Sequence, residues 1–379
     1  MLTLLKDGSH NPPKRVSTGI PFIAGATEIK YFDIDFSKAT HITKEDYDEI
    51  HKKFEVEKDD ILLTIVGTVG NVAIVKEEYL PFSLQRNIAI LRPNKELHYS
   101  YLFYWLTSSF FKNILYQRGN RTAQPRFYLR ELANTPIIIQ PLEIQKKNTN
   151  FLLSIDQKIR NLQNQNRILE QMAQAIFKSW FVDFDGVTDF DDSELGKIPK
   201  GWNVKQIKDF CKVRRGASPR PVGDPKYFGG DIPWIKIADV SKSPSPYLFS
   251  TKETVTEEGA KKSVHLPKNS LIISNSGTVG KPIFLTRDGC IHDGWLYFEN
   301  LIEMSQEFLY FYFLTLTAHL NLMVDGTVQK NLNTTIVAEI KFVCPEKKYF
   351  GSFLKISQII LKTIKENQIK INTLTSIRN

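Results

Sequence analysis

The chain has 379 residues, of which 42% are apolar and 12% aromatic, enough for more than one hydrophobic core. Its formal net charge of +9 permits a polyanionic partner such as DNA without requiring one. The three cysteines, Cys211, Cys290 and Cys344, are too scattered for a disulfide framework or a cysteine zinc site, and no apolar run is long enough to cross a bilayer, so we expect a cytoplasmic protein.

Residues 1–145 predict an α+β domain made mostly of short strands and turns. β-branched runs such as residues 61–66 are bounded by Gly, Asn, Asp or Pro, which is typical of strands. The tetrapeptide GTVG at residues 67–70 predicts a tight turn between strands, because both glycines suit a positive φ or a close backbone approach. An aromatic helical segment is expected at residues 99–116.

Residues 146–190 predict one long helix. Nine residues are spaced alternately by three and four positions, which places them on one heptad seam: Leu152, Ile155, Ile159, Leu162, Asn166, Leu169, Ala173, Ile176 and Trp180. A helix of about 30 residues is roughly 45 Å long, somewhat more than one turn of B-DNA at about 34 Å. The helix is therefore a candidate spacer.

Residues 191–347 predict a second copy of the first domain. The tetrapeptide GTVG returns at residues 277–280, and GIPFI at residues 19–23 is matched by DIPWI at residues 231–235. A second aromatic helical segment is expected at residues 307–323, and TVQKNLNTTIVAEIKFVCP at residues 327–345 matches TAQPRFYLRELANTPIIIQP at residues 122–141. Similarity in the same order along the chain indicates a duplication.

Residues 348–379 predict a second long helix. One helical face carries Ile356, Ile360, Ile364, Asn367, Ile371 and Leu374. An exposed apolar seam is unfavourable, so we expect this helix to pack antiparallel against the central one. An asparagine lies within each seam, and such buried polar residues fix the register of coiled coils.

Matched polar, basic and aromatic residues of the two copies are candidates for DNA contact, because these side chains bind phosphates and base edges. In the first copy they are Gly67, Thr68, Gly70, Gln85, Arg86, Arg118, Arg121, Gln124 and Arg126. In the second copy they are Arg214, Arg215, Arg220, Lys226, Trp234, Lys236, Asn275, Thr278, Lys281, Gln329 and Lys330.

The sequence contains no recognisable catalytic set. GTVGK resembles part of a phosphate-binding loop, but that loop needs Gly where Asn275 stands and Ser or Thr where Pro282 stands. The seven histidines show no H-x-x-x-H spacing, and no glycine-rich signature for AdoMet is present. We therefore predict no catalytic residue, no metal site and no cofactor in this chain.

These residues resemble the specificity (S, HsdS) subunits of type I restriction-modification systems over nearly the whole chain. DGSHNPP and RRGASPR resemble the openings of the family's two target-recognition domains, and LEQMAQAIFKSWFVDFDGV at residues 169–187 resembles its central conserved region. The second domain is preceded by IPKGWNVKQIKDFCKV, whereas only residues 1–6 precede the matching DG of the first. That departure puts the folding or the partner docking of the first domain in question.

The resemblance implies a DNA-binding subunit without catalytic activity. Each target-recognition domain would read one half of a split, asymmetric DNA site, and an antiparallel coiled coil would hold the domains in pseudo-two-fold opposition. Two modification subunits carrying AdoMet would dock on this scaffold, and restriction subunits would join them. We expect docking of the modification subunits at Phe177, Trp180, Phe181 and Phe184.

Two other classes of protein remain open on the sequence alone. An autonomous DNA methyltransferase or nuclease with duplicated recognition domains would need an AdoMet fold or a carboxylate cluster, and an activity assay on the isolated chain would reveal either. A coiled-coil adaptor without DNA binding would leave the arginine and glutamine clusters unused, and salt-dependent binding to DNA would exclude it.

Overall fold

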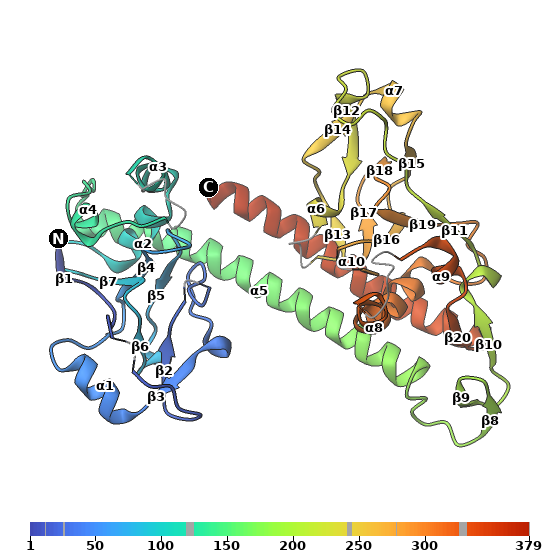
Figure 1. Ribbon diagram of the computed structural model, residues 1–379, viewed down its shortest axis with the longest axis horizontal. Coiled ribbons are helices and arrows are strands. Elements are labelled where there is room, and N and C mark those ends of the chain that lie inside the picture. Colours follow the sequence, from blue (N-terminus) through green and yellow to red (C-terminus); the bar gives the residue numbers. More distant parts are fainter. Residues whose placement is uncertain are drawn as a thin grey trace. The chain divides into compact units, whose positions relative to one another are not determined.

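The computed structural model describes residues 1–11, 13–25, 27–118, 125–240, 245–277, 279–325 and 332–378. It divides into two compact units, unit 1 (Met1–Asp156) and unit 2 (Gln157–Asn379), and each combines helices with small sheets (Figure 1). This confirms the α+β class predicted from the sequence. Within the described ranges, no helix is both long and apolar enough to cross a membrane.

Unit 1 contains a four-stranded antiparallel sheet and a three-stranded sheet. The larger sheet has the order β1 (Leu2–Asp7), β7 (Ile88–Pro93), β4 (Ile61–Thr64), β5 (Val72–Ile74). The smaller has the order β3 (Thr40–Ile42), β2 (Ile20–Ile23), β6 (Ser83–Leu84), and β2 runs parallel to β6. The helices are α1 (Lys44–His51), α2 (Tyr99–Thr107), α3 (Ser109–Arg118) and α4 (Leu129–Ala133), with short 3-10 turns at Phe36–Lys38 and Glu77–Tyr79.

Unit 2 has two larger sheets and two two-stranded antiparallel sheets. The first sheet has the order β11 (Lys212–Arg215), β19 (Trp295–Glu299), β16 (Leu271–Ser274), β17 (Pro282–Leu285), β13 (Tyr247–Leu248). The second has the order β14 (Glu253–Val255), β12 (Phe228–Ile235), β18 (Gly289–Ile291), β15 (Val264–Leu266). The pairs are β10 (Asn203–Gln206) with β20 (Lys341–Cys344), and β8 (Phe190–Ser193) with β9 (Gly196–Pro199). The remaining helices of this unit are α6 (Ile237–Val240), α7 (Glu257–Ala260), α8 (Gln306–Asp325), α9 (Thr334–Ala338) and a 3-10 turn at Ile207–Asp209.

The two units share one topology, which confirms the duplication predicted from the sequence. The order β1-β7-β4-β5 corresponds to β11-β19-β16-β17, and β3-β2-β6 corresponds to β14-β12-β18. GIPFI and DIPWI occupy equivalent strands: Phe22 pairs in parallel with Ser83, and Trp234 pairs in parallel with Cys290. The register of the repeat therefore extends to individual strand pairs.

The aromatic helical segment differs between the copies. In unit 2 it is the single helix α8, whereas in unit 1 it is divided at Ser108 into α2 and α3. Ser108 has an extended backbone (φ −65°, ψ 155°), and its hydroxyl accepts a hydrogen bond from the Phe111 backbone N–H at 3.2 Å. A serine that caps a new helix ends the preceding one, which the aromatic pattern alone did not predict.

The segment preceding the second domain is part of the core of unit 2. Trp202, Ile207 and Phe210 are buried, and the Ile207 backbone N–H donates to the Ile340 carbonyl at 3.2 Å. The segment of unit 1 that corresponds to β20 is residues 136–139. It forms no strand, and Ile138 within it is 77% exposed. A cavity of about 330 Å³ lies beside it, lined by Leu5, Leu102, Trp105, Ile137 and other apolar residues.

The two long helices are α5 (Leu142–Phe181) and α10 (Lys347–Arg378). The first turns of α5 belong to unit 1, where Gln145 accepts from the His98 backbone N–H at 2.9 Å and Asp156 accepts from the Tyr104 hydroxyl at 2.7 Å. Leu152 is half-buried in this part of the helix, and Ile155 is buried.

The remainder of α5 packs antiparallel to α10 within unit 2, as the heptad seams predicted (Figure 1). Seam residues of both helices are buried, namely Ile159, Leu162, Ala173, Ile360, Ile364 and Ile371, while Leu169, Ile176 and Leu374 are half-buried. The two asparagines meet: Asn367 Nδ2 donates to Asn166 Oδ1 at 3.0 Å, and Asn166 Nδ2 donates to the Ile364 carbonyl at 3.4 Å. This contact fixes one register of the helix pair.

The asparagine pair gives a first testable prediction. We expect Asn166→Leu and Asn367→Leu each to lower the free energy of unfolding by about 1–3 kcal/mol, because either change leaves a partly buried amide without its partner. The double variant should lose less than the sum, because no amide is then left unpaired. Urea unfolding of the full chain, with hydrogen exchange in α10, measures both effects. Strictly additive losses would show that the contact does not couple the helices.

Candidate DNA interface

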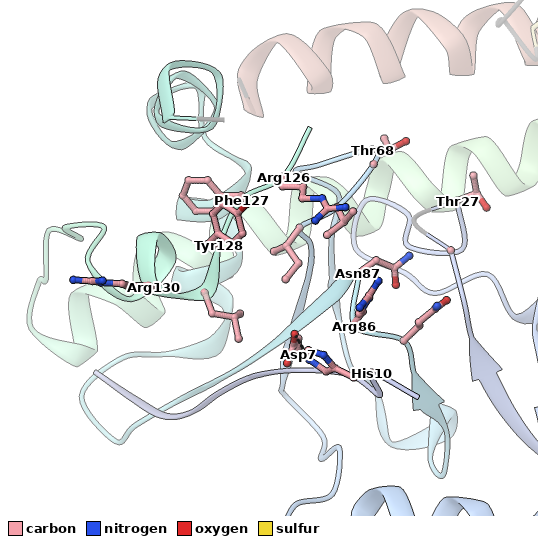
Figure 2. A pocket seen from close by; sticks show the side chains of 16 residues that line it. Asp7, His10, Thr27, Thr68, Arg86, Asn87, Arg126, Phe127, Tyr128 and Arg130 are labelled. Atoms are coloured by element: carbon pink, nitrogen blue, oxygen red, sulfur yellow. Dashed lines mark hydrogen bonds and ion pairs between the residues drawn. The ribbon is translucent and has the colours of Figure 1, made fainter. Parts of the chain in front are cut away.

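A cleft of about 790 Å³ in unit 1 collects several of the residues predicted to contact DNA (Figure 2). Its walls are the turn at Gly67 and Thr68, the loop of residues 85–87, and residues 126–130. Four basic residues line it: His10, Arg86, Arg126 and Arg130. The structure thus brings together side chains from three distant parts of the first copy.

The GTVG segment is a tight turn between β4 and β5, as predicted. Gly67 and Gly70 have φ of 79° and 99°, a region that favours glycine. Thr64 closes the turn, because its hydroxyl donates to the Thr68 carbonyl at 2.5 Å and accepts from the Asn71 backbone N–H at 2.9 Å. The turn therefore has a fixed shape that does not depend on a ligand.

Backbone hydrogen bonds attach residues 125–128 to this turn. The Gly67 N–H donates to the Pro125 carbonyl at 3.0 Å, and the Phe127 N–H donates to the Ile65 carbonyl at 2.8 Å. Phe127 is buried in the core, so the residues on either side of it are held at the surface of the cleft. This arrangement positions Arg126 beside the turn.

The loop of residues 85–87 is held by three other elements. The Gln85 N–H donates to the Ile23 carbonyl at 3.0 Å, and the Arg86 N–H donates to the Ser9 carbonyl at 3.1 Å. The Ile65 N–H donates to the Asn87 carbonyl at 2.8 Å. At Gly8, an added Cβ would lie 2.1 Å from the Leu84 carbonyl oxygen, so only glycine allows this close approach. The loop backbone is rigidly placed next to the cleft.

The charges of the cleft are partly paired. His10 Nε2 lies 2.9 Å from Asp7 Oδ2, and Figure 2 shows the two side chains pointing toward each other. Arg86 is exposed, and among the described residues no hydrogen bond or ion pair involves its side chain. Its guanidinium is therefore available to an anionic or hydrogen-bond-accepting partner.

Unit 2 repeats the same backbone framework. Gly277 and Gly280 have φ of 72° and 78°, and Ser274 takes the place of Thr64, accepting from the Lys281 N–H at 2.9 Å. The Asn275 N–H donates to the Gly294 carbonyl at 2.9 Å, and the Leu332 N–H donates to the Asn275 carbonyl at 2.9 Å. Both hydrogen bonds correspond to those made by Ile65 in unit 1.

Asp293 organises the polar residues of this framework in unit 2. Its carboxylate accepts from the Ser218 hydroxyl at 3.0 Å and lies 2.9 Å from His292 Nε2 and 3.5 Å from an Arg220 nitrogen. Its carbonyl accepts from Arg215 Nε at 2.6 Å. The Gly294 N–H donates to His292 Nδ1 at 2.8 Å, which places the proton of a neutral imidazole on Nε2, and burial lowers the pKa of His292, which favours that neutral form.

Other basic candidates lie outside this cluster. Arg214 pairs with Glu299 at 3.1 Å, Lys236 pairs with Glu253 at 2.5 Å, and Lys226 is exposed beside the Tyr227 ring. Lys281 donates to the Val240 carbonyl at 2.8 Å, and burial lowers its pKa. A lysine held in this way fixes the end of α6 and is poorly placed for a phosphate.

Burial corrects two of the predicted DNA contacts. Trp234 is 1% exposed, and its ring packs against Phe228 and His292. Asn275 is also buried, and its Nδ2 donates to the Asp293 carbonyl at 3.0 Å. Both side chains shape the framework from inside and do not reach a ligand directly.

Burial also corrects two of the four predicted docking residues, while Trp180 and Phe184 remain predictions. Phe177 and Phe181 lie in the core of unit 2, where they contact Phe308 and Phe353. Trp180 and Phe184 are half-buried and pack against the same core. The aromatic end of α5 thus fills the interior of its own unit, and its phenylalanines are not a surface for a partner.

Some candidates lie outside the described residues, namely Arg121, Gln124, Thr278, Gln329 and Lys330, and Arg118 is the last residue of α3. Conversely, the sequence did not single out Asp7, His10, Arg130, Ser218, His292 or Asp293. The sequence could have indicated His292 and Asp293 only by their position in the repeat, because residues 292–294 precede β19 as residues 85–87 precede β7.

Two copies of one α+β domain, with equivalent loops that carry polar and basic side chains, are the arrangement expected of a duplicated DNA-recognition protein. The chain belongs to the family described as type I restriction modification DNA specificity domain, whose model matches residues 11–171 and 199–376. It is therefore a DNA sequence-recognition subunit, as the resemblance indicated.

Curated relatives agree with this assignment, and a solved structure has a similar fold. The type I restriction enzyme HindI specificity subunit of Haemophilus influenzae is 24% identical over 400 residues, covering 86% of this chain and 85% of the relative. The MjaIX specificity subunit of Methanocaldococcus jannaschii is 25% identical over 332 residues, covering 85% and 75%. The S subunit of a type I restriction-modification system from M. genitalium has a similar fold, with a TM-score of 0.62 at 15% identity over 100% of this chain and 91% of that one.

Proposed function

We propose that each unit reads one half of a bipartite, asymmetric DNA sequence, and that α5 and α10 set the spacing between the halves. The observation that carries this proposal is one backbone framework bearing different side chains in the two units, Arg86 in one and Asp293 in the other. Equal frameworks with unequal side chains read different sequences, whereas identical ones would read a palindrome.

In this proposal the chain supplies recognition and no catalytic residue. Partner modification subunits bind AdoMet and transfer the methyl group, and restriction subunits join the complex in the cytoplasm. Exposed apolar side chains on the two long helices support a docking role for this pair, in particular Ile168, Met172, Ile359 and Ile369. These residues replace the buried phenylalanines as the candidate docking surface.

The methylation pattern of a host tests the function. We expect a host that carries this chain together with its modification subunit to methylate adenines in a motif of two short, different half-sites separated by unspecified base pairs. Methylome sequencing of that host, against one carrying the modification subunit alone, measures this directly. A contiguous motif, or no motif that depends on this chain, would refute the proposal.

A further inference from the structure

We propose that the loops of residues 85–87 and 292–294 determine the sequence specificity of unit 1 and unit 2, and that Arg86 reads a guanine in the half-site of unit 1. The inference rests on the proposed function and adds to it the residues that choose the bases.

The two loops occupy equivalent places with equivalent backbone contacts. The residue after each parallel strand donates to the neighbouring strand: Gln85 to the Ile23 carbonyl at 3.0 Å, and His292 to the Ile235 carbonyl at 3.0 Å. At the end of each first strand a glycine passes close to this region, and an added Cβ at Gly216 would lie 2.3 Å from the His292 carbonyl oxygen. The backbones are thus fixed alike, so differences in recognition must come from the side chains.

The charges at these places are exchanged between the units. Unit 1 has Asp7 at the end of β1 and Arg86 in the loop, whereas unit 2 has Arg215 at the end of β11 and Asp293 in the loop. Both units keep one acidic and one basic side chain, but the strand end and the loop have exchanged them. The exchange therefore gives the loop a basic side chain in unit 1 and an acidic one in unit 2.

Arg86 is the donor that unit 1 offers. It lies in the same part of the cleft as the Asp7 and His10 pair, and its own side chain is exposed and unpaired among the described residues (Figure 2). A planar guanidinium donates two parallel hydrogen bonds to O6 and N7 of guanine in the major groove. The rigid loop supplies the fixed origin that such bidentate contact requires.

Unit 2 uses its loop differently. The Asp293 carboxylate is already engaged by Ser218, His292 and Arg220, so it is a positioning residue. The Arg220 side chain is 69% exposed and lies outside the loop itself. The acid therefore holds a guanidinium from another segment at the place that corresponds to Arg86, which gives unit 2 a different reach along its half-site.

The test compares three variants of the full chain in complex with its modification subunit. We expect Arg86→Ala to weaken binding to the cognate duplex by about 5- to 150-fold and to make one G·C position of half-site 1 degenerate in the methylome. Half-site 2 and the gap should not change. Arg86→Lys should restore overall affinity more than base discrimination, because an ammonium cannot donate in the same planar fork. Lys53→Ala, which removes the same charge from an exposed position outside the cleft, should change affinity by roughly twofold or less.

Binding to duplexes with each base of half-site 1 varied, at several salt concentrations, separates the outcomes. If Arg86 only binds a phosphate, Arg86→Ala will weaken all duplexes alike, reduce the salt slope by about one and leave the motif intact, which overturns the inference while the bipartite function stands. If the wild-type complex yields no bipartite motif, the proposed function fails, and the inference fails with it. Degeneracy confined to half-site 1 supports both the role of Arg86 and the proposed bipartite function.

Discussion

Replacing Phe177 with alanine is expected to lower the free energy of unfolding of unit 2 by about 3–5 kcal/mol. Phe177 is 1% exposed, and its ring centroid lies 5.0 Å from those of Phe181 and Phe308 and 5.4 Å from that of Phe353. Removing it leaves a cavity where α5, α8 and α10 meet. Urea unfolding of the full chain, followed by hydrogen exchange in α8 and α10, measures the loss.

Phe151→Ala is the matched control, because this phenylalanine lies on the same helix, is 59% exposed and is not among the candidate docking residues. We expect it to change stability by about 0.5 kcal/mol or less. If Phe177→Ala leaves stability unchanged and instead weakens binding of the modification subunit, the residue is a docking contact and the core assignment is wrong. The pair of variants thus separates the two roles proposed for the aromatic end of α5.

The helices were predictable because their signal is local. A seam repeating every three and four residues needs no knowledge of the partner to indicate which face is buried, and Ile159, Ile364 and Ile371 lie where it placed them. The asparagine contact followed as well, since both seams carry one. The two GTVG turns were predictable for a similar reason, because positive φ values select glycine wherever the turn occurs.

The role of individual side chains in the candidate interface was not predictable in the same way. Trp234 was counted as a DNA contact because it is aromatic and repeated, but β12 pairs with β14 on one side and β18 on the other, which buries it. Lys281 follows a glycine turn, yet its amine reaches a carbonyl some forty positions earlier in the chain. These outcomes depend on contacts between distant segments, which composition and spacing do not encode.

The Asp293 cluster is a group of polar residues that the sequence did not single out but that the structure brings together. Ser218 and Arg220 precede Asp293 by more than seventy positions, and neither forms a recognisable pattern with it. Once the strand order is known, however, the loop before β19 falls beside the end of β11, and the cluster follows. The duplication could have indicated this cluster from the sequence, because the equivalent loop in unit 1 contains Gln85 and Arg86, both of which were predicted to contact DNA.

Shortening both long helices by one heptad is expected to change the DNA gap and not the half-sites. Deleting residues 158–164 from α5 and 368–374 from α10 removes seven residues on the same side of the Asn166 and Asn367 contact, so the heptad phase and the register are kept. Seven residues correspond to about 10 Å of helix, and therefore to about three base pairs at roughly 3.4 Å each.

If α5 and α10 set the spacing, methylome sequencing of a host with the shortened chain and its modification subunit should show the original half-sites with a gap shorter by about that amount. Deleting only residues 158–159 from α5 is the control, because a two-residue deletion rotates the preceding part of the seam by about 200° away from α10, and the bipartite motif should then be lost. Altered half-sites with an unchanged gap would show that the helices do not act as the spacer.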